Sequence, residues 1–333
     1  MKLLLTGGAG YIGSHTCVEL LSAGYEVVIY DNFSNSNPIV IERIKQITGK
    51  TVSVIQGDIR DKKALIDALV ANNCEAVMHF AGLKAVGKSV EQPLSYYQNN
   101  VAGTVSLLNA MQVTGRKSIV FSSSATVYGV PQYLPLTEAH PRSAVNPYGR
   151  SKLIIEDMLY DVYQSDPTWK INILRYFNPA GAHQSGLIGE DPQAIPDNLM
   201  PFITQVATGR RDKLNILGND YPTPDCTGVR DYIHVVDLAR GHCKAIMRLE
   251  KPQYTAINLG TGRGYSVLDV VKAFEVSSGR SIPYQIAPRR AGDVASCFAD
   301  PTRAESILGW KAEFGLESMC RDAWNWQQHN PSG

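Results

Sequence analysis

Short hydrophobic runs alternate with segments of helical periodicity along the first half of the chain. The runs carry apolar side chains at consecutive positions, as central parallel strands do when helices cover both faces of a sheet. They lie at 3–6, 26–30, 52–56, 76–80 and 118–122. Between the first two runs, Cys17, Leu20 and Leu21 fall on one helical stripe, which we expect to pack on the sheet. This alternation predicts an α/β fold with a doubly wound parallel sheet of the Rossmann type.

The pattern changes after Phe177. Two stretches rich in Gly, Pro, Asp and Asn, at 178–198 and 218–228, predict long loops, and long loops in enzymes usually line a functional site. Shorter helical segments are expected near 199–208, 235–249, 266–278 and 302–309. We therefore predict a first domain over 1–177 and a smaller mixed α/β substrate-binding domain over 178–333. A segment near 229–250 is expected to return to the first domain.

Composition narrows the classes of partner. The 333 residues have a formal net charge of +1, so no strong field favours nucleic acid or an anionic membrane. No apolar stretch reaches the ~18 residues of a membrane span. The six cysteines form no CxxC pair and the histidines are scattered, which argues against a metal site and fits a reducing, cytoplasmic setting.

Three glycines follow the first hydrophobic run with the spacing GxxGxxG. Gly7 permits a tight turn, Gly10 allows the backbone to approach a pyrophosphate, and Gly13 allows close packing of helix and strand. The N-terminus of the following helix then offers N–H groups and a positive dipole end to phosphates. Asp31 ends the second run, where a carboxylate can accept hydrogen bonds from an adenosine ribose and would repel a 2′-phosphate. These features predict NAD as cofactor.

A second carboxylate and a Tyr-Lys pair follow. Asp58 ends the third run and either contacts adenine or caps a helix. Tyr148 and Lys152 are four residues apart, so if this stretch is helical they lie one turn apart on the same face, where the ammonium can favour the phenolate. Ser124 lies at the carboxyl end of the fifth run, where open α/β sheets place their chemistry. A Tyr-Lys pair by itself is common in helices, and a serine cluster can be an ordinary turn.

These motifs, in this order, resemble the extended short-chain dehydrogenases/reductases and, within them, the UDP-hexose 4-epimerases. The resemblance covers nearly the whole chain. It rests on TGGAGYIGSH at 6–15, HFAGLKAVG at 79–87, FSSSATVYG at 121–129, YGRSK at 148–152, RYFNPAGAH at 175–183, DNLMPFI at 197–203, GNDYPTPDCTGVRDYIHVVD at 218–237 and APRRAGD at 287–293.

The resemblance implies a role for each matching residue. Tyr148 would be the base, Lys152 its activator and Ser124 the hydrogen-bonding partner at the sugar O4. Contacts to NAD, beyond Gly7, Gly10 and Gly13, would come from Tyr11, Ile12, Asp31, Asn32, Asp58, Ile59, Phe80, Ala81, Gly82, Lys84, Asn99 and Lys152, with Tyr176 as a wall beside the nicotinamide. Contacts to the UDP-sugar would come from Asn178, Asn198, Leu199, Arg230, Arg290 and Asp293. The resemblance also implies a homodimer.

One position departs from the family pattern. Several bacterial members carry a bulky tyrosine four residues after the aspartate that corresponds to Asp293, whereas this chain has Cys297. The smaller side chain would leave room for a 2-acetamido group. We therefore expect turnover of UDP-N-acetylhexosamines as well as UDP-galactose and UDP-glucose, although Cys297 can equally be a small buried hydrophobe.

Three other functions are weighed against this one. The 4,6-dehydratases that resemble the chain carry an Asp-Glu pair just after the strand-end serine or threonine. Here Ala125 and Thr126 stand there and cannot protonate a leaving hydroxyl. A UDP-glucuronate 4-epimerase remains an alternative. A non-catalytic NAD-binding sensor would be expected to lose the tyrosine or the lysine, and both are present.

Overall fold

The computed structural model describes residues 1–192, 196, 198–290 and 292–330. Asp197 and Ala291, which belong to two of the motifs above, lie outside the described residues. The chain divides into two compact units. The first consists of Met1–Gly129, Pro141–Arg175 and Ala239–Ile257, and the second of Val130–His140, Tyr176–Leu238 and Asn258–Gly333.

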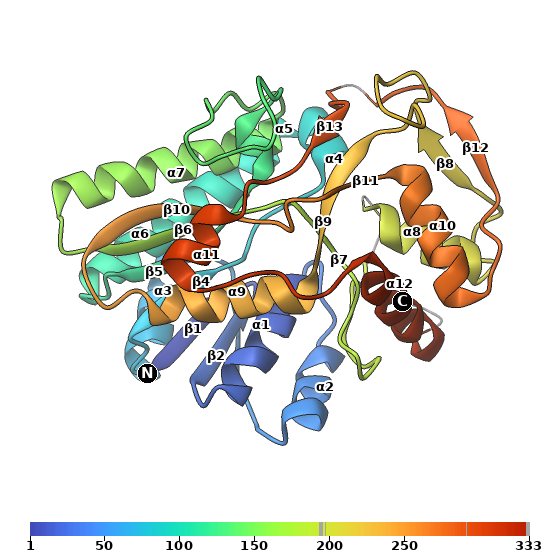
Figure 1. Cartoon of the computed structure of the whole chain (residues 1–333). Coiled ribbons are helices and arrows are strands. Elements are labelled where there is room, and N and C mark those ends of the chain that lie inside the picture. Colours follow the sequence, from blue (N-terminus) through green and yellow to red (C-terminus); the bar gives the residue numbers. More distant parts are fainter. Residues whose placement is uncertain (193–195, 197, 291, 331–333) are drawn as a thin grey trace. The chain divides into compact units, whose positions relative to one another are not determined.

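The first unit is built on a seven-stranded sheet, and the predicted doubly wound α/β fold is confirmed (Figure 1). Each of the five predicted strands forms, and the fifth runs two residues further than expected, to Ser124. The strand order is β10-β6-β5-β4-β1-β2-β3, with parallel pairing from β5 to β3. The strands are β1 (Lys2–Thr6), β2 (Glu26–Asp31), β3 (Ser53–Gln56), β4 (Ala76–His79), β5 (Ser118–Ser124), β6 (Lys170–Tyr176) and β10 (Gln253–Leu259).

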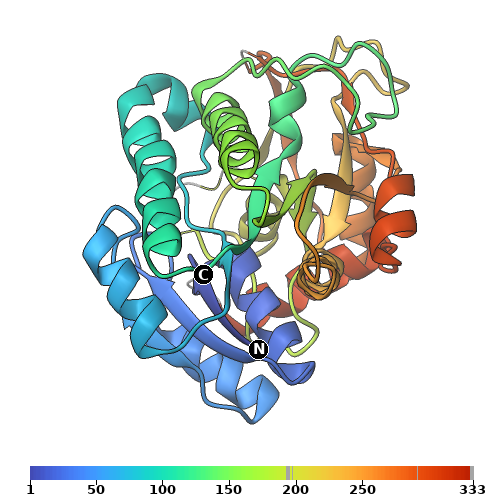
Figure 2. The same cartoon turned by 90° about the vertical axis from the view of Figure 1, so that its left-hand side faces the viewer.

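Helices cover both faces of this sheet (Figure 2). On one face, α3 (Lys62–Ala71), α6 (Gly103–Val113) and α7 (Pro147–Ser165) share a core with Leu4 and Val28 of β1 and β2. Leu3 and Leu5 alternate with Leu4 along the strand and so point to the other face. That face meets α1 (Tyr11–Ser22), in which Cys17, Leu20 and Leu21 are buried as the stripe predicted.

The remaining elements of this unit are short. They are α2 (Ile39–Thr48), α4 (Val86–Glu91), α5 (Pro93–Tyr96), the π-helix η1 (Tyr97–Ala102) and the 3₁₀-helix η2 (Ala125–Tyr128). The helix α9 (Val235–Met247) begins in the second unit and ends in the first, where the carbonyl of Ala245 accepts a hydrogen bond from Asn172 on β6.

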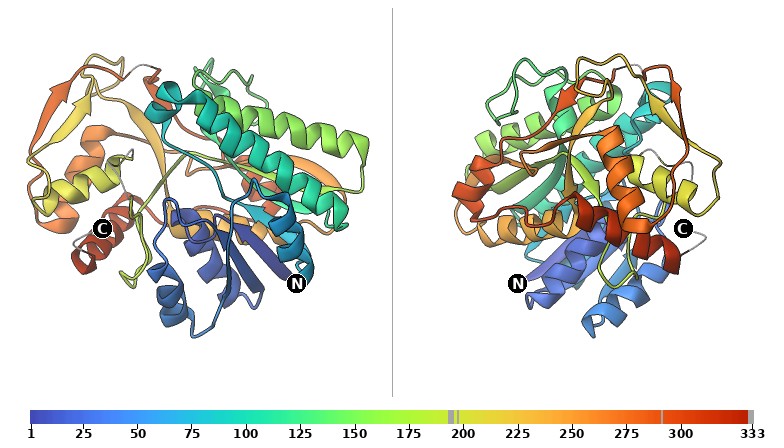
Figure 3. Two further views of the ribbon diagram at one scale, coloured as in Figure 1. Left: turned by 180° about the vertical axis from the view of Figure 1, so that it is seen from behind. Right: turned by 45° about the vertical axis from the view of Figure 1, so that its right-hand side comes forward.

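The second unit combines helices with short strands (Figure 3). The helices α8 (Leu199–Ala207), α10 (Val267–Ser278) and α12 (Leu316–His329) pack around one core that includes Ile203, Phe274 and Met319. Its strands are β7 (Asn178–Ala180), β8 (Leu214–Leu217), β9 (Val229–His234), β11 (Gly264–Ser266), β12 (Tyr284–Ala287) and β13 (Ser296–Cys297), and α11 (Thr302–Leu308) completes it.

One strand, β7, forms where the composition predicts a loop. Residues 178–180 belong to a stretch whose composition predicts a loop, yet β7 pairs in parallel with β9, with Asn178 opposite Tyr232. The sequence Asn-Pro-Ala has little strand propensity of its own, so the pairing partner more than fifty residues away determines this conformation. No helix within the described ranges is long and apolar enough to cross a membrane.

Candidate active site

The glycine-rich turn after β1 is packed so tightly that side chains would not fit. Gly7 has φ +70°, and a Cβ there would lie 2.6 Å from the amide nitrogen of Ala81. A Cβ at Gly13 would lie 2.4 Å from the carbonyl oxygen of Gly7. The turn, the first helix and the end of β4 therefore meet backbone to backbone. The predicted reasons for Gly7 and Gly13 agree with this geometry.

The N-terminus of α1 is suited to an anionic group. Gly10 is its N-cap residue, has an extended backbone and provides no side-chain cap. Next to it, the buried carboxylate of Asp31 accepts hydrogen bonds from the amides of Ala9 (3.0 Å) and Phe33 (2.9 Å) and from Ser36 (3.1 Å). Asp31 thus ties the glycine-rich turn to the end of β2. A tight turn, an uncapped helix end and this carboxylate together fit the pyrophosphate and adenosine ribose of NAD.

The alternative of a helix cap at Asp58 is wrong. Asp61 is the N-cap of α3, accepting a hydrogen bond from the amide of Ala64. Asp58 instead binds Arg60 through a side-chain hydrogen bond of 2.7 Å, which holds the pKa of the carboxyl down at about 2. Asn32 also donates to Asp58 at 3.4 Å, so these two candidate adenosine contacts lie together. The neighbouring Ile59 is buried in the core under α3 and α6.

The loop after β4 carries further candidate contacts to NAD, and the buried Asn100 holds it. The amides of Phe80 and Ala81 donate to the Thr6 carbonyl. Asn100 accepts from the amide of Leu83 and donates to its carbonyl and to Ser151 of α7. Asn99, a predicted contact, donates to Asn100. Sequence reasoning missed Asn100, because only the π-helical geometry of η1 distinguishes it from the preceding asparagine.

Tyr148 lies in the first turn of α7, and local chemistry places it there. Asn146 caps the helix by accepting from the amide of Gly149 (2.8 Å), and Pro147 occupies the first helical position. Ser124, at the end of β5, acts on the Tyr148 side chain and lowers the pKa of its phenol. The hydroxyl of Thr126 donates to Ser124 at 2.9 Å, which leaves the Ser124 proton free to point at Tyr148.

Opposing effects act on the protonation of Tyr148. Burial raises the pKa of the phenol, while the Ser124 hydrogen bond and the charge of Lys84 lower it, and burial is the largest of these. The protein alone therefore keeps Tyr148 protonated. A positive charge brought by a bound oxidised nicotinamide would favour the phenolate, as the Tyr-Lys interpretation requires.

Lys152 follows one turn later on the same helix, as predicted. Its ammonium donates to the carbonyl of Ser122 at 2.6 Å and lies 4.9 Å from the centre of the Phe121 ring. A Cβ at Gly82 would lie 3.7 Å from this ammonium, which places the candidate NAD loop beside it. Burial lowers the pKa of Lys152 to about 8, while the charge of Glu156 acts in the opposite direction.

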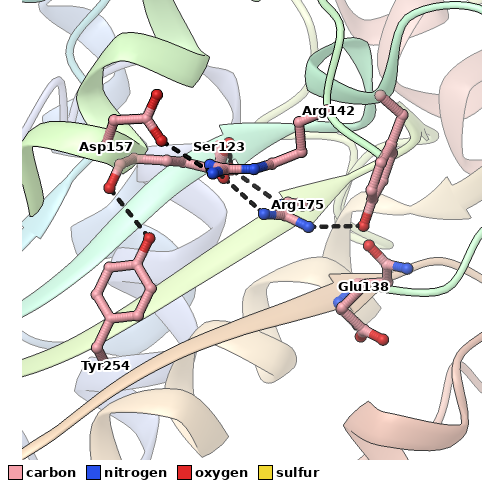
Figure 4. A network of polar contacts seen from close by, with 9 residues as sticks. Ser123, Glu138, Arg142, Asp157, Arg175 and Tyr254 are labelled. Atoms are coloured by element: carbon pink, nitrogen blue, oxygen red, sulfur yellow. Dashed lines mark hydrogen bonds and ion pairs between the residues drawn. The ribbon is translucent and has the colours of Figure 1, made fainter. Parts of the chain in front are cut away.

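A buried polar network lies beneath these groups (Figure 4). Glu156, one turn after Lys152, has no exposed surface and accepts hydrogen bonds from Ser123 (2.6 Å) and from Arg175 (2.6 and 3.0 Å). Arg175 donates in turn to the hydroxyl of Tyr128. Because Ser122 holds Lys152 and Ser123 holds Glu156, two successive turns of α7 are fastened to the end of β5. Sequence reasoning missed this network, although a glutamate four residues after the lysine is a visible signal.

The second unit gathers charged candidates around one carboxylate. Asp293 accepts from Arg290 at 2.8 Å and lies 3.8 Å from Arg230, so these three candidate contacts to the UDP-sugar lie together. Both guanidinium groups are partly exposed and can form forked hydrogen bonds to phosphate. Of the other candidates, Asn178 donates to the Asp231 carbonyl, Asn198 donates to Glu190, Leu199 begins α8, and Tyr176 is buried at the end of β6.

Cys297 lies directly beside Arg230. The two residues are opposite each other in the pairing of β13 with β9, so Cys297 is next to the candidate diphosphate site. The adjacent Asp231 is buried, and it fixes this region by accepting from the amides of Thr261, Gly262 and Ala299. The structure therefore places Cys297 next to Arg230, a candidate contact to the UDP-sugar.

Comparisons of the sequence and of the structure with known proteins find similar proteins of one family. The model of the family described as GDP-mannose 4,6 dehydratase matches residues 4–323. The chain is 58% identical to a UDP-glucose 4-epimerase of Bacillus subtilis over all of this chain and 98% of that relative. It is 57% identical to the human UDP-glucose 4-epimerase, again over all of this chain and 98% of that relative.

A solved structure gives the same result. The UDP-glucose 4-epimerase of Bifidobacterium longum, solved with NAD+ and UDP, superimposes with a TM-score of 0.98 at 53% identity and covers all of both chains. The family model is described as a dehydratase, but this chain has Ala125 and Thr126 at the positions where we expect the acid pair of a dehydratase. The chain therefore belongs to the UDP-glucose 4-epimerase family of the extended short-chain dehydrogenases/reductases.

Proposed function

We propose that this chain interconverts UDP-galactose and UDP-glucose by inverting C4 with a bound NAD, and that it also accepts UDP-N-acetylhexosamines. We assign NAD to the first unit and the UDP group to the second. The observation that carries the proposal is the arrangement at the end of β5, next to a turn that fits a dinucleotide. There Thr126 hydrogen-bonds to Ser124, Lys152 hydrogen-bonds to the carbonyl of Ser122, and Ser124 lowers the pKa of Tyr148.

The residues of the first unit move one proton at the sugar O4. Tyr148 accepts it when C4 is oxidised and gives it back when C4 is reduced, while Ser124 forms the hydrogen bond that aligns the hydroxyl. The ammonium of Lys152, held by Ser122, stabilises the phenolate form. Bound NAD supplies the acceptor for the C4 hydride and its return.

The residues of the second unit hold the substrate without reacting. Arg230 and Arg290 carry the positive charge that a UDP diphosphate requires, and Asp293 orients both side chains. Inversion requires the 4-keto sugar to present its other face to the same Tyr148. Binding through the diphosphate permits this, because the sugar can turn about its flexible linkage while UDP stays bound.

The breadth toward acetylated sugars rests on Cys297. Its side chain is smaller than tyrosine by a phenol ring, and it lies beside Arg230. A cavity wall with a small residue at this place would admit a 2-acetamido group. Tyrosine there would remove that volume and leave the hydroxyl at C2 of an ordinary hexose unaffected.

A homodimer is also part of the proposal. Exposed apolar side chains lie on α5, α6 and α7 at Leu94, Val105, Val113 and Tyr160. Helices of one copy that packed against the same helices of a second copy would bury them. Sedimentation of the purified chain as a monomer at micromolar concentration would contradict this assignment.

The test of the function uses two substrates and one variant. UDP-galactose and UDP-N-acetylgalactosamine are incubated separately with the purified holoprotein, without added nicotinamide, and the epimers are resolved by NMR. We expect conversion of both, and loss of the acetylated conversion alone in Cys297→Tyr. Conversion of UDP-galactose only would refute the assigned breadth, and conversion of neither would refute the epimerase function.

A further inference from the structure

The loop between β8 and β9 is more ordered than its composition suggests. Residues 218–228 contain no helix or strand, but internal hydrogen bonds close the loop. The amide of Tyr221 donates to the carbonyl of Cys226 (3.1 Å), and the hydroxyl of Thr223 donates to the carbonyl of Thr227 (2.6 Å). Asp225 accepts from the amide of Thr227 and from Ser266, the N-cap of α10. The loop is thus a fixed platform in the second unit.

The ring of Tyr221 lies at the base of this platform. Only 3% of the residue is exposed. The guanidinium of Arg289 lies 4.0 Å from the centre of the ring and is held by Asp220 at 2.6 Å. A Cβ at Gly218 would come within 2.8 Å of the Tyr221 ring, so glycine at 218 makes room for it. The position of the ring is therefore determined on several sides.

The hydroxyl of Tyr221 contrasts with its well-packed ring. It is buried and has no hydrogen-bond partner among the residues that the structure describes. Leaving a buried hydroxyl unpaired is costly, so such groups need a reason in a native protein. The hydroxyl of Tyr254, by contrast, donates to the carbonyl of Glu156 at 3.0 Å, and that of Tyr30 donates to the carbonyl of Asp58 at 2.9 Å. Phenylalanine would fill the same volume at 221 without this cost.

The contacts of the side chain place it beside the candidate UDP-sugar contacts. Arg289, whose guanidinium packs on the ring, directly precedes Arg290, which donates to Asp293. Asp293 and Arg230 are also among the charges that act on the pKa of Tyr221. Burial and Asp293 raise the pKa of the phenol, so the hydroxyl stays protonated at neutral pH and can donate. A donor beside two arginines is suited to an oxygen-rich anion.

We propose that the Tyr221 hydroxyl donates a hydrogen bond to an oxygen acceptor of the bound nucleoside diphosphate, on the ribose or on a phosphate. The inference rests on the assignment of the UDP group to the second unit and adds one residue to it. Tyr221 binds substrate and does not take part in the chemistry at C4. Its aromatic ring is structural, whereas its hydroxyl serves the ligand.

The test separates these two parts of the side chain. UDP binding to the purified holoprotein is measured by calorimetry for the unchanged chain, for Tyr221→Phe and for the matched control Tyr254→Phe. A net hydrogen bond corresponds to about a three- to tenfold change in affinity. We expect Tyr221→Phe to weaken UDP binding by at least threefold with an unchanged or higher melting temperature. We expect Tyr254→Phe to keep UDP affinity and to melt at a lower temperature.

Three results would overturn or refine the inference. A loss of UDP affinity smaller than threefold in Tyr221→Phe overturns it, as does a melting temperature that falls as in Tyr254→Phe, since the hydroxyl would then have a structural partner. Absence of UDP binding by the unchanged chain would overturn the proposed function itself. Repeating the measurement with uridine and UMP locates the acceptor, because a ribose contact weakens all three ligands and a terminal phosphate contact weakens UDP alone.

Discussion

The two units assemble their candidate sites in different ways. In the first, the reacting groups occupy neighbouring positions on two elements, the end of β5 and the first turns of α7, and hydrogen bonds connect them. In the second, the candidate groups come from β7, the start of α8, β9 and the segment before β13. The first arrangement is suited to chemistry at one atom, and the second to holding an extended anionic ligand.

This difference predicts which substitutions change the catalytic rate and which change the affinity for substrate. Changes in the first unit should act on the rate of the bound complex, because its groups move a proton. Changes in the second should act on affinity, because its groups hold UDP equally in the ground and transition states. The comparison would fail if a substitution in the first unit changed only affinity, or if one in the second unit changed only the rate.

The largest effect is expected for Tyr148→Phe. Removing the proton carrier should lower kcat by about 10²- to 10⁴-fold. UDP affinity should not change, since the ring stays in place. Steady-state rates and UDP calorimetry measure both quantities, with Tyr160→Phe as a control on the exposed side of the same helix. A loss smaller than tenfold would remove Tyr148 from the chemistry.

Arg230→Ala should act on affinity. A charge-assisted hydrogen bond contributes about 1.5–3 kcal/mol, so KM should rise roughly 10- to 100-fold. We expect kcat to change less than threefold, because the reacting groups belong to the other unit. Initial rates over a wide range of UDP-galactose concentrations would show this. A fall in kcat at unchanged KM would contradict the assignment of Arg230.

Glu156→Gln should act on stability and rate together. Arg175 would lose the charge that pairs with it in a buried site, which costs about 3–5 kcal/mol of unfolding free energy. The fastening of α7 to Ser123 would weaken, and we expect kcat to fall about tenfold by analogy with other misplaced catalytic groups. Urea unfolding and rates of the folded fraction measure the two effects.

Asp157→Asn is the matched control for that substitution. It removes a carboxylate from the same helix, but its side chain is 55% exposed and pairs with Arg142 at the surface. Exposed pairs contribute about 0–1 kcal/mol, so both measurements should stay near those of the unchanged chain. Equal effects of the two substitutions would show that burial of Glu156 does not matter.

The smallest effect concerns pH. The pKa of Lys152 is lowered to about 8, so the ammonium is present below pH 8 and lost above it. The rate should therefore fall as the pH rises through about 8, since the phenolate of Tyr148 loses its neighbouring charge. A guanidinium stays protonated throughout this range, so Lys152→Arg should show no such fall. A fall of equal size in both proteins would assign it to another group.

Local periodicity explains what could be predicted from the sequence. The five strands, the buried stripe of Cys17, Leu20 and Leu21 on the first helix, and the glycines at 7 and 13 depend on patterns within a few residues. Such patterns are visible in a sequence because strand and helix geometry convert them directly into position. The long loop at 218–228 was predictable for another reason, its content of Gly, Pro, Asp and Asn.

The missed features depend on distant partners. β7 forms because β9 pairs with it, and Glu156 of α7 is held by Arg175 of β6. The sequence shows that Thr126 is not an acid, but it does not show that the Thr126 hydroxyl orients Ser124. The unpaired hydroxyl of Tyr221 can be recognised only when its surroundings are known. No local pattern encodes such contacts.

The central claim is that C4 loses its hydrogen to a bound cofactor and recovers the same hydrogen. The most direct test is conversion of UDP-galactose in D₂O by the purified holoprotein, with NMR of the hydrogen at C4 of the UDP-glucose that forms. We predict that C4 keeps protium through many turnovers, because the hydrogen never exchanges with water. Deuterium at C4 would contradict the account, since it would show that C4 is inverted by proton removal and return.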